Sequence, residues 1–122
     1  PLSISTSNLS KTMAKKLARV SISNTKSNTC TTAAYLIAQL GKNYSLPKEQ
    51  QINGSSLLNF ALKTIQQLKY AIGGVMEFLE CEDNEFLLNF YAQNHFKPFG
   101  TRIASTSENG KPFLLYQLLK FI

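Results

Sequence analysis

In the segment from Asn84 to Phe96, the side chains of Asn84, Tyr91 and His95 are candidates to move a proton or to bind a polar group. The phenol of Tyr91 has an unperturbed pKa of about 10, so it is protonated at neutral pH and able to donate. The amide of Asn84 suits a helix cap or a ligand contact. His95 stands where the helix should end, and there a histidine is more often a favourable charge than a base. Taken alone, Tyr91 also fits a tyrosine at the edge of the core.

A second segment, Gln51-Ile52-Asn53-Gly54-Ser55-Ser56, precedes the longest helical pattern of the chain. The first backbone N–H groups of a helix have no partner within it and point at any anion on its axis. A glycine lets the backbone approach a phosphate without an intervening Cβ. The segment therefore fits a phosphate-binding loop, although Asn53-Gly54 taken alone is more often a turn before a capped helix.

Candidates for a general base are weaker. Glu77, Glu80, Glu82 and Asp83 lie on or just after an apolar run, where carboxylates are usually solvated. Cys30 and Cys81 form neither a zinc pattern nor a disulfide framework, so we expect two reduced thiols. The sequence shows no P-loop, nucleophile elbow, Cys/His cluster or other metal motif.

Hydrophobic periodicity predicts the elements that must position these groups. The pattern predicts a loop over 21–29 and a turn over 108–110. It predicts a strand over Thr32–Leu40, and the apolar residues on both faces of that strand indicate a central position in the sheet, covered on both sides. The predicted order βαβαβαββ is typical of an α/β domain with a parallel centre and an antiparallel hairpin at one end. The predicted strands are 2–6, 32–40, 75–81, 97–105 and 113–122, and the helices run from Ser7 or Asn8 to Val20, from Asn53 to Ile72 and from Asn84.

At 122 residues the chain is long enough for one domain. The net charge of +6 favours anionic partners. No apolar run approaches the ~20 residues that span a bilayer, and no signal peptide is recognisable, so we expect a cytoplasmic protein without a membrane partner. The sequence opens on Pro1 without an initiator methionine, from which we expect a longer gene product.

One helix concentrates positive charge: Lys11, Lys15 and Arg19 recur at four-residue intervals, with Lys16 beside them. A solvated helix face is the simpler interpretation. The alternative is a rim that binds the phosphate of a cofactor or an RNA backbone.

The order of residues from position 84 onward resembles the last strand–helix unit of the GNAT N-acetyltransferases. The residues that match in register are Asn84, Leu87, Phe90, Tyr91 and Phe96, while His95 stands where the family prefers glycine. Gln51 and Gly54 match the family's pyrophosphate loop, with Ser56 at its last small position. The resemblance covers residues 31–122 and lacks the family's N-terminal strand and helices.

This resemblance implies a single GNAT-like domain over residues 1–122, with a three-layer α/β/α architecture and a mixed sheet. It implies acetyl-CoA-dependent transfer of an acetyl group to a primary amine, with Tyr91 as the acid beside the sulfur. The cofactor-binding residues that it implies are Ile37, Gln39, Leu40, Gln51, Asn53, Gly54, Ser55, Ser56 and Asn84.

Three alternatives remain at this stage. The chain could be a non-catalytic GNAT-like fragment or interaction subunit, or it could acetylate aminoacyl-tRNA as related toxins do. It could also be a basic RNA-binding protein without acyl chemistry. Without the N-terminal elements, an open sheet edge could also pair with a second copy to form a homodimer.

Overall fold

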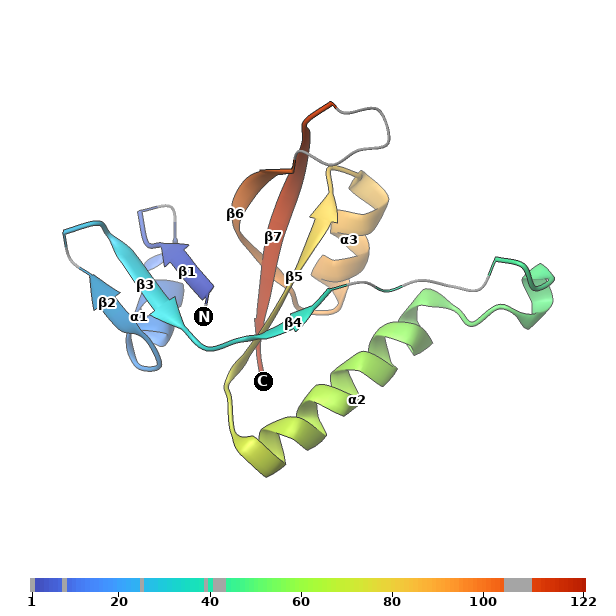
Figure 1. Ribbon diagram of the computed structural model, residues 1–122, viewed down its shortest axis with the longest axis horizontal. Helices are drawn as coiled ribbons and strands as arrows, with labels where there is room; N and C mark the ends of the chain where they lie inside the picture. Colours follow the sequence, from blue (N-terminus) through green and yellow to red (C-terminus); the bar gives the residue numbers. More distant parts are fainter. Residues whose placement is uncertain (1, 8, 25, 39, 41–43, 105–110) are drawn as a thin grey trace.

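The computed structural model describes residues 2–7, 9–24, 26–38, 40, 44–104 and 111–122 (Figure 1). The described elements form two sheets and three α-helices, so the predicted mixed α/β class is confirmed. Their order is β1 (Leu2–Ser5), α1 (Lys11–Ala18), β2 (Ile22–Asn24), β3 (Thr29–Thr32), β4 (Tyr35–Ile37), the 3₁₀ turn η1 (Lys48–Gln50), α2 (Gly54–Ile72), β5 (Met76–Glu82), α3 (Glu85–Gln93), β6 (Lys97–Ala104) and β7 (Phe113–Phe121).

The larger sheet has four strands in the order β4-β5-β7-β6. β4 and β5 run parallel, and β7 pairs antiparallel with β5 on one side and with β6 on the other. The antiparallel hairpin predicted at one end of the sheet is therefore confirmed, but the predicted parallel centre is wrong, because the parallel pair lies at the opposite edge and the two central strands, β5 and β7, pair antiparallel. The predicted turn over 108–110 lies outside the described residues.

The prediction of one central strand over Thr32–Leu40 is wrong. β3 ends at Thr32 in the small antiparallel sheet β1-β3-β2, whereas β4 covers three residues at the edge of the large sheet. The apolar residues of this segment enter both core clusters, Ala34 the one beside the small sheet and Ile37 the one beneath α2, while Leu36 is 54% exposed. The predicted loop over 21–29 contains β2, because pairing of Ile22 with Thr31 overrides the turn-forming composition.

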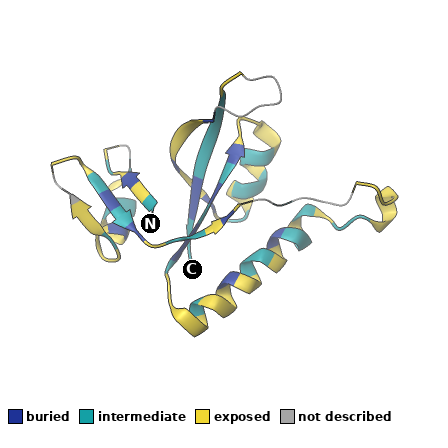
Figure 2. Ribbon diagram, in the orientation of Figure 1, coloured by how far each residue is buried: buried dark blue, intermediate teal, exposed yellow. Residues whose placement is uncertain are grey.

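The buried residues, whose positions on the ribbon are dark blue in Figure 2, form two clusters. Leu118 and Leu119 are consecutive on β7, so they point to opposite faces and enter different clusters. The first cluster packs α2 and α3 on one face, through Ile37, Leu58, Ile65, Leu79, Cys81, Phe96 and Leu118. The second packs α1 and the small sheet on the other, through Ile4, Leu17, Cys30, Met76, Phe99 and Leu119.

The three predicted helices are present, and polar caps set where each begins. α1 begins later than predicted, because Ser10 is its N-cap and accepts from the backbone N–H of Met13. α2 ends at Ile72 and is capped by Gly73, whose φ of 83° lies in the region that glycine adopts readily. Within the described part of the chain, no helix combines the length and apolar character needed to cross a membrane.

Candidate functional site

The N-terminus of α2 offers free backbone donors. The side chain of Asn53 accepts from the N–H of Ser56 at 2.8 Å, and the carbonyl of Asn53 accepts from the N–H of Leu57 at 3.1 Å. Helix geometry leaves the N–H groups of Gly54 and Ser55 without an acceptor in the helix. These two donors and the positive end of the helix dipole can bind an anion.

α3 presents Tyr91 near its C-terminal end, and both ends of this helix are fixed. At the start, the side chain of Asn84 accepts from the N–H groups of Phe86 and Leu87, at 2.9 and 3.3 Å. At the end, the N–H of Phe96 donates to the carbonyl of Tyr91 and that of His95 to Ala92, each at 3.1 Å. This pair of bonds is a Schellman motif, which fixes the backbone next to the phenol.

A cavity of about 390 Å³ joins the two helices. Five of the residues that the sequence implicated line it, namely Leu40, Asn53, Gly54, Ser55 and Tyr91. Phe90 closes part of the gap: a Cβ built on Gly54 would meet two ring carbons of Phe90 at 3.5 and 3.7 Å. The first residues of α2 and Tyr91 of α3 therefore line one cavity.

Burial raises the pKa of Tyr91 above its usual range, and the neighbouring Cys81 adds to this effect. The ring of Tyr91 packs edge-to-face on Phe90 and Phe96, with centroids 5.2 and 5.8 Å apart. Burial, with the charges of Asp83 and Glu82, also raises the pKa of Cys81. A neutral thiol is a poor nucleophile, and Cys81 does not line the cavity.

Four other implicated residues lie elsewhere or already have partners. Ile37 is buried in the first core cluster, and the amide of Gln51 donates to the carbonyl of Leu46 at 3.0 Å. Neither Ser56 nor Asn84 lines the cavity, and both take part in helix capping. Gln39 lies outside the described residues.

None of the candidate bases lines the cavity among the residues that the structure describes. Glu80 pairs with Arg102 at 2.6 Å, and Glu77 is fully buried. Glu82, the last residue of β5, and Asp83, which follows it, are both exposed. His95 has a φ of 69°, the left-handed conformation that explains why glycine would suit this position.

The cavity wall also contains residues that the sequence analysis did not single out. They are Tyr44, Leu57 and Phe86, which stand beside Leu87 and Phe90 from the matched motif. Phe86 and Phe90 are four residues apart on α3 and therefore share a helix face. This spacing is the sequence signal that could have identified the aromatic wall of the cavity. The structure leaves Phe86 77% exposed.

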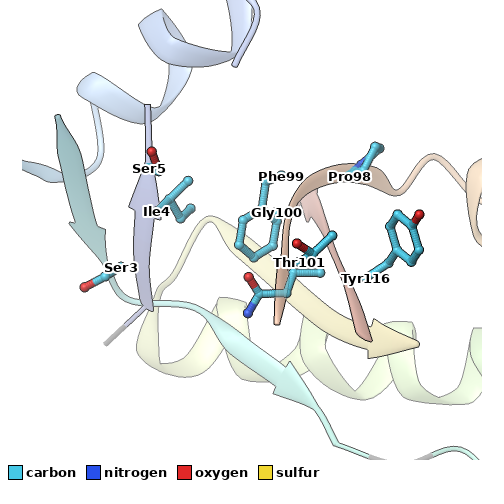
Figure 3. Close-up of a pocket in the computed structure, with 9 residues that line it drawn as sticks. Ser3, Ile4, Ser5, Pro98, Phe99, Gly100, Thr101 and Tyr116 are labelled. Carbon is cyan, nitrogen blue, oxygen red and sulfur yellow. The ribbon is translucent and has the colours of Figure 1, made fainter. Parts of the chain in front are cut away.

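A second hollow, of about 600 Å³, lies between β1 and β6 (Figure 3). Ile4 and Phe99 extend between the two strands there, and Thr101 and Gln117 add polar groups. None of the implicated residues lines it. In the described residues, no group of three or more His, Cys, Asp or Glu side chains is arranged to hold a metal ion.

No protein-family model matches this chain, and neither a curated protein nor a solved structure is similar enough to count as a match. The function therefore has to be inferred from the residues of the chain itself.

Proposed function

We propose that this protein is an acetyl-CoA-dependent N-acetyltransferase of the GNAT type, acting on a primary amine. One observation carries the proposal: Gly54 and Ser55, whose amides are free at the start of α2, line the same cavity as Tyr91. An anion site beside a proton donor suits a ligand with a diphosphate at one end and a thioester at the other.

The arrangement of elements supports the same function. The parallel pair β4–β5 leads at its carboxyl end to the cavity, through Leu40 after β4 and α3 after β5. In open α/β sheets, ligands bind in crevices at the carboxyl ends of strands. With α2 and α3 on one face of the sheet and α1 on the other, the fold is compatible with the implied three-layer α/β/α architecture.

When bound, acetyl-CoA would supply the thioester. The amides of Gly54 and Ser55 would hold its diphosphate, and the apolar wall formed by Leu57, Phe86 and Phe90 would cover its arm. As the amine forms a C–N bond and the C–S bond breaks, Tyr91 would donate its proton to the departing sulfur. The proton released by the amine would pass to water, because no described carboxylate or imidazole lines the cavity.

Calorimetry with acetyl-CoA and a thiol-release assay test this function. We expect Tyr91→Phe to bind acetyl-CoA as the wild type does but to release thiol roughly a hundredfold more slowly, the lower range for general acid catalysis. Tyr44→Phe is the matched control, because Tyr44 lines the same cavity but is 77% exposed, and its turnover should be unchanged. S-acetylpantetheine, which lacks the diphosphate, should bind much more weakly. Absence of acetyl-CoA binding at high micromolar concentration would overturn the proposal.

A non-catalytic acyl-CoA-binding module is the second candidate. It is favoured because the N–H of Ser56 is already bonded to Asn53, which leaves two free amides, and because the described cavity wall carries no base. The same experiments separate the two functions: tight cofactor binding without thiol release, with every small primary amine tried, would favour the module.

A further inference from the structure

The net charge of the protein is confined to its N-terminal part. Residues 1–48 contain seven basic residues and no acidic residue, whereas residues 49–122 contain six basic residues and all seven acidic ones. The excess of positive charge therefore belongs to α1, the small sheet and the segment that leads to α2. An asymmetry of this kind between the two parts of a chain is typical of proteins that bind a polyanion.

The structure directs the charge of α1 outward. Leu17, on the inner side of the helix, is fully buried against Ile4 and Cys30 of the small sheet. Lys11, Lys15 and Arg19 are exposed and follow one another every four residues, about 6 Å apart along the axis. Lys16 is also exposed and lies over the ring of Phe121, with its Nζ 5.5 Å from the ring centroid.

In the described part of the chain, no ion pair joins a basic residue of α1 to an acidic residue. The ion pair between Glu80 and Arg102 lies in the large sheet, and no acidic residue precedes Glu49 in the sequence. A row of exposed, unneutralised cations on a rigid helix complements a row of phosphates, each of which releases a counterion when it is bound.

Two features decide what kind of polyanion fits. An interfacial membrane helix must insert its apolar side, but that side of α1 is buried in the second core cluster. Proteins that bind single strands stack the bases on aromatic rings, but residues 1–34 contain no aromatic side chain, and the ring of Phe121 beside α1 already packs against Lys16. Contacts with a duplex backbone need neither property. The exposed hydroxyl of Thr12, beside Lys15 and Lys16, can exchange hydrogen bonds with a ribose 2′-OH, which only RNA offers.

We infer that the outer face of α1, formed by Lys11, Thr12, Lys15, Lys16 and Arg19, binds the backbone of double-stranded RNA. The contact is independent of base sequence and depends on salt. It does not require acetyl transfer, since α1 belongs to the second core cluster and the cavity of Tyr91 borders the first.

Fluorescence anisotropy with an RNA duplex of about 20 base pairs tests this inference. Binding should weaken between about 50 and 200 mM salt, with a slope of log K against log salt near −3 for three or four phosphate contacts. In the double variant Lys11→Gln/Lys15→Gln, the magnitude of the slope should decrease by about 1.8. The association constant at 0.15 M salt should fall about fivefold for each lost charge. Glutamine keeps a helix propensity close to that of lysine, so α1 should remain folded.

Lys63→Gln is the matched control, because it removes an equally exposed lysine from α2, outside the basic part. Its affinity for the RNA duplex should equal that of the wild type. The inference is overturned if Lys63→Gln weakens binding as much as the double variant does. It is also overturned if duplex DNA, single-stranded RNA or vesicles containing phosphatidylserine bind at least as tightly as duplex RNA. Because the measurement contains no acetyl-CoA, its failure leaves the transferase proposal untouched.

Discussion

Glu77 is a charged residue type placed where water does not reach. It is 0% exposed, and neither oxygen of its carboxyl group has a hydrogen-bond partner. Burial raises the pKa of Glu77, while Lys120, opposite it on β7, lowers the pKa in part. An unpaired buried carboxylate is costly, so the folded protein favours the neutral acid.

Glu77→Gln should therefore change how stability depends on pH. Because the pKa is raised in the folded state, the folded protein holds a proton that the unfolded chain loses, and stability falls as pH rises above the unfolded value of about 4.5. Glutamine does not titrate, so the variant lacks this fall in stability. The free energy of unfolding of the variant, relative to that of the wild type, should therefore rise by up to about 1.4 kcal/mol per pH unit until the folded-state pKa of Glu77 is reached. Urea unfolding from pH 4 to pH 8 measures it. Glu82→Gln, at an exposed position on the same strand, should retain the wild-type profile.

At the scale of single elements, the C-terminal end of α3 contains a residue in an unfavourable backbone conformation. His95 occupies the left-handed position of the Schellman motif, with a φ of 69°. A residue with a Cβ in that conformation costs roughly 1–2 kcal/mol relative to glycine. The ring contact between Tyr91 and Phe96 across the motif offsets part of this cost and orients the phenol.

His95→Gly should accordingly stabilise the protein by about 1 kcal/mol in urea unfolding, with thiol release unchanged. Asn94→Gly places the same residue one position earlier, where φ is −94° and there is no strain to relieve. That control also loses the bond from the Asn94 side chain to the carbonyl of Phe90, at 2.8 Å, so it should be destabilised. Equal effects of the two variants would contradict this account of the helix end.

At the scale of the whole molecule, the two core clusters separate two surfaces. The first cluster supports Phe90 and Tyr91 beneath the cavity, and the second holds α1 and the small sheet. Both clusters meet at β7, through Leu118 on one face and Leu119 on the other. Both clusters therefore contribute to the stability of the whole fold. Binding at the cavity of Tyr91 and binding at the outer face of α1 should nevertheless respond to different substitutions.

Leu118→Ala and Leu119→Ala are a matched pair, since the two residues are adjacent and both almost fully buried. Each should lower the free energy of unfolding by about 2–5 kcal/mol. At a temperature where both variants remain folded, Leu118→Ala should weaken acetyl-CoA binding and Leu119→Ala should leave it unchanged. Calorimetry on both variants measures this difference, and equal losses of affinity would show that the two faces are coupled.

The sequence by itself determined the three helices and the α/β class, because helical periodicity and polar caps are local signals that need no distant partner. It also singled out Leu40, Asn53, Gly54, Ser55 and Tyr91, which the fold brings to one cavity. Only the tertiary structure decided that 32–40 is divided between two sheets, since strand pairing depends on residues far apart in the chain. It also decided which amides of α2 stay free and that Glu77 is buried, because both follow from three-dimensional neighbours that a linear pattern does not contain.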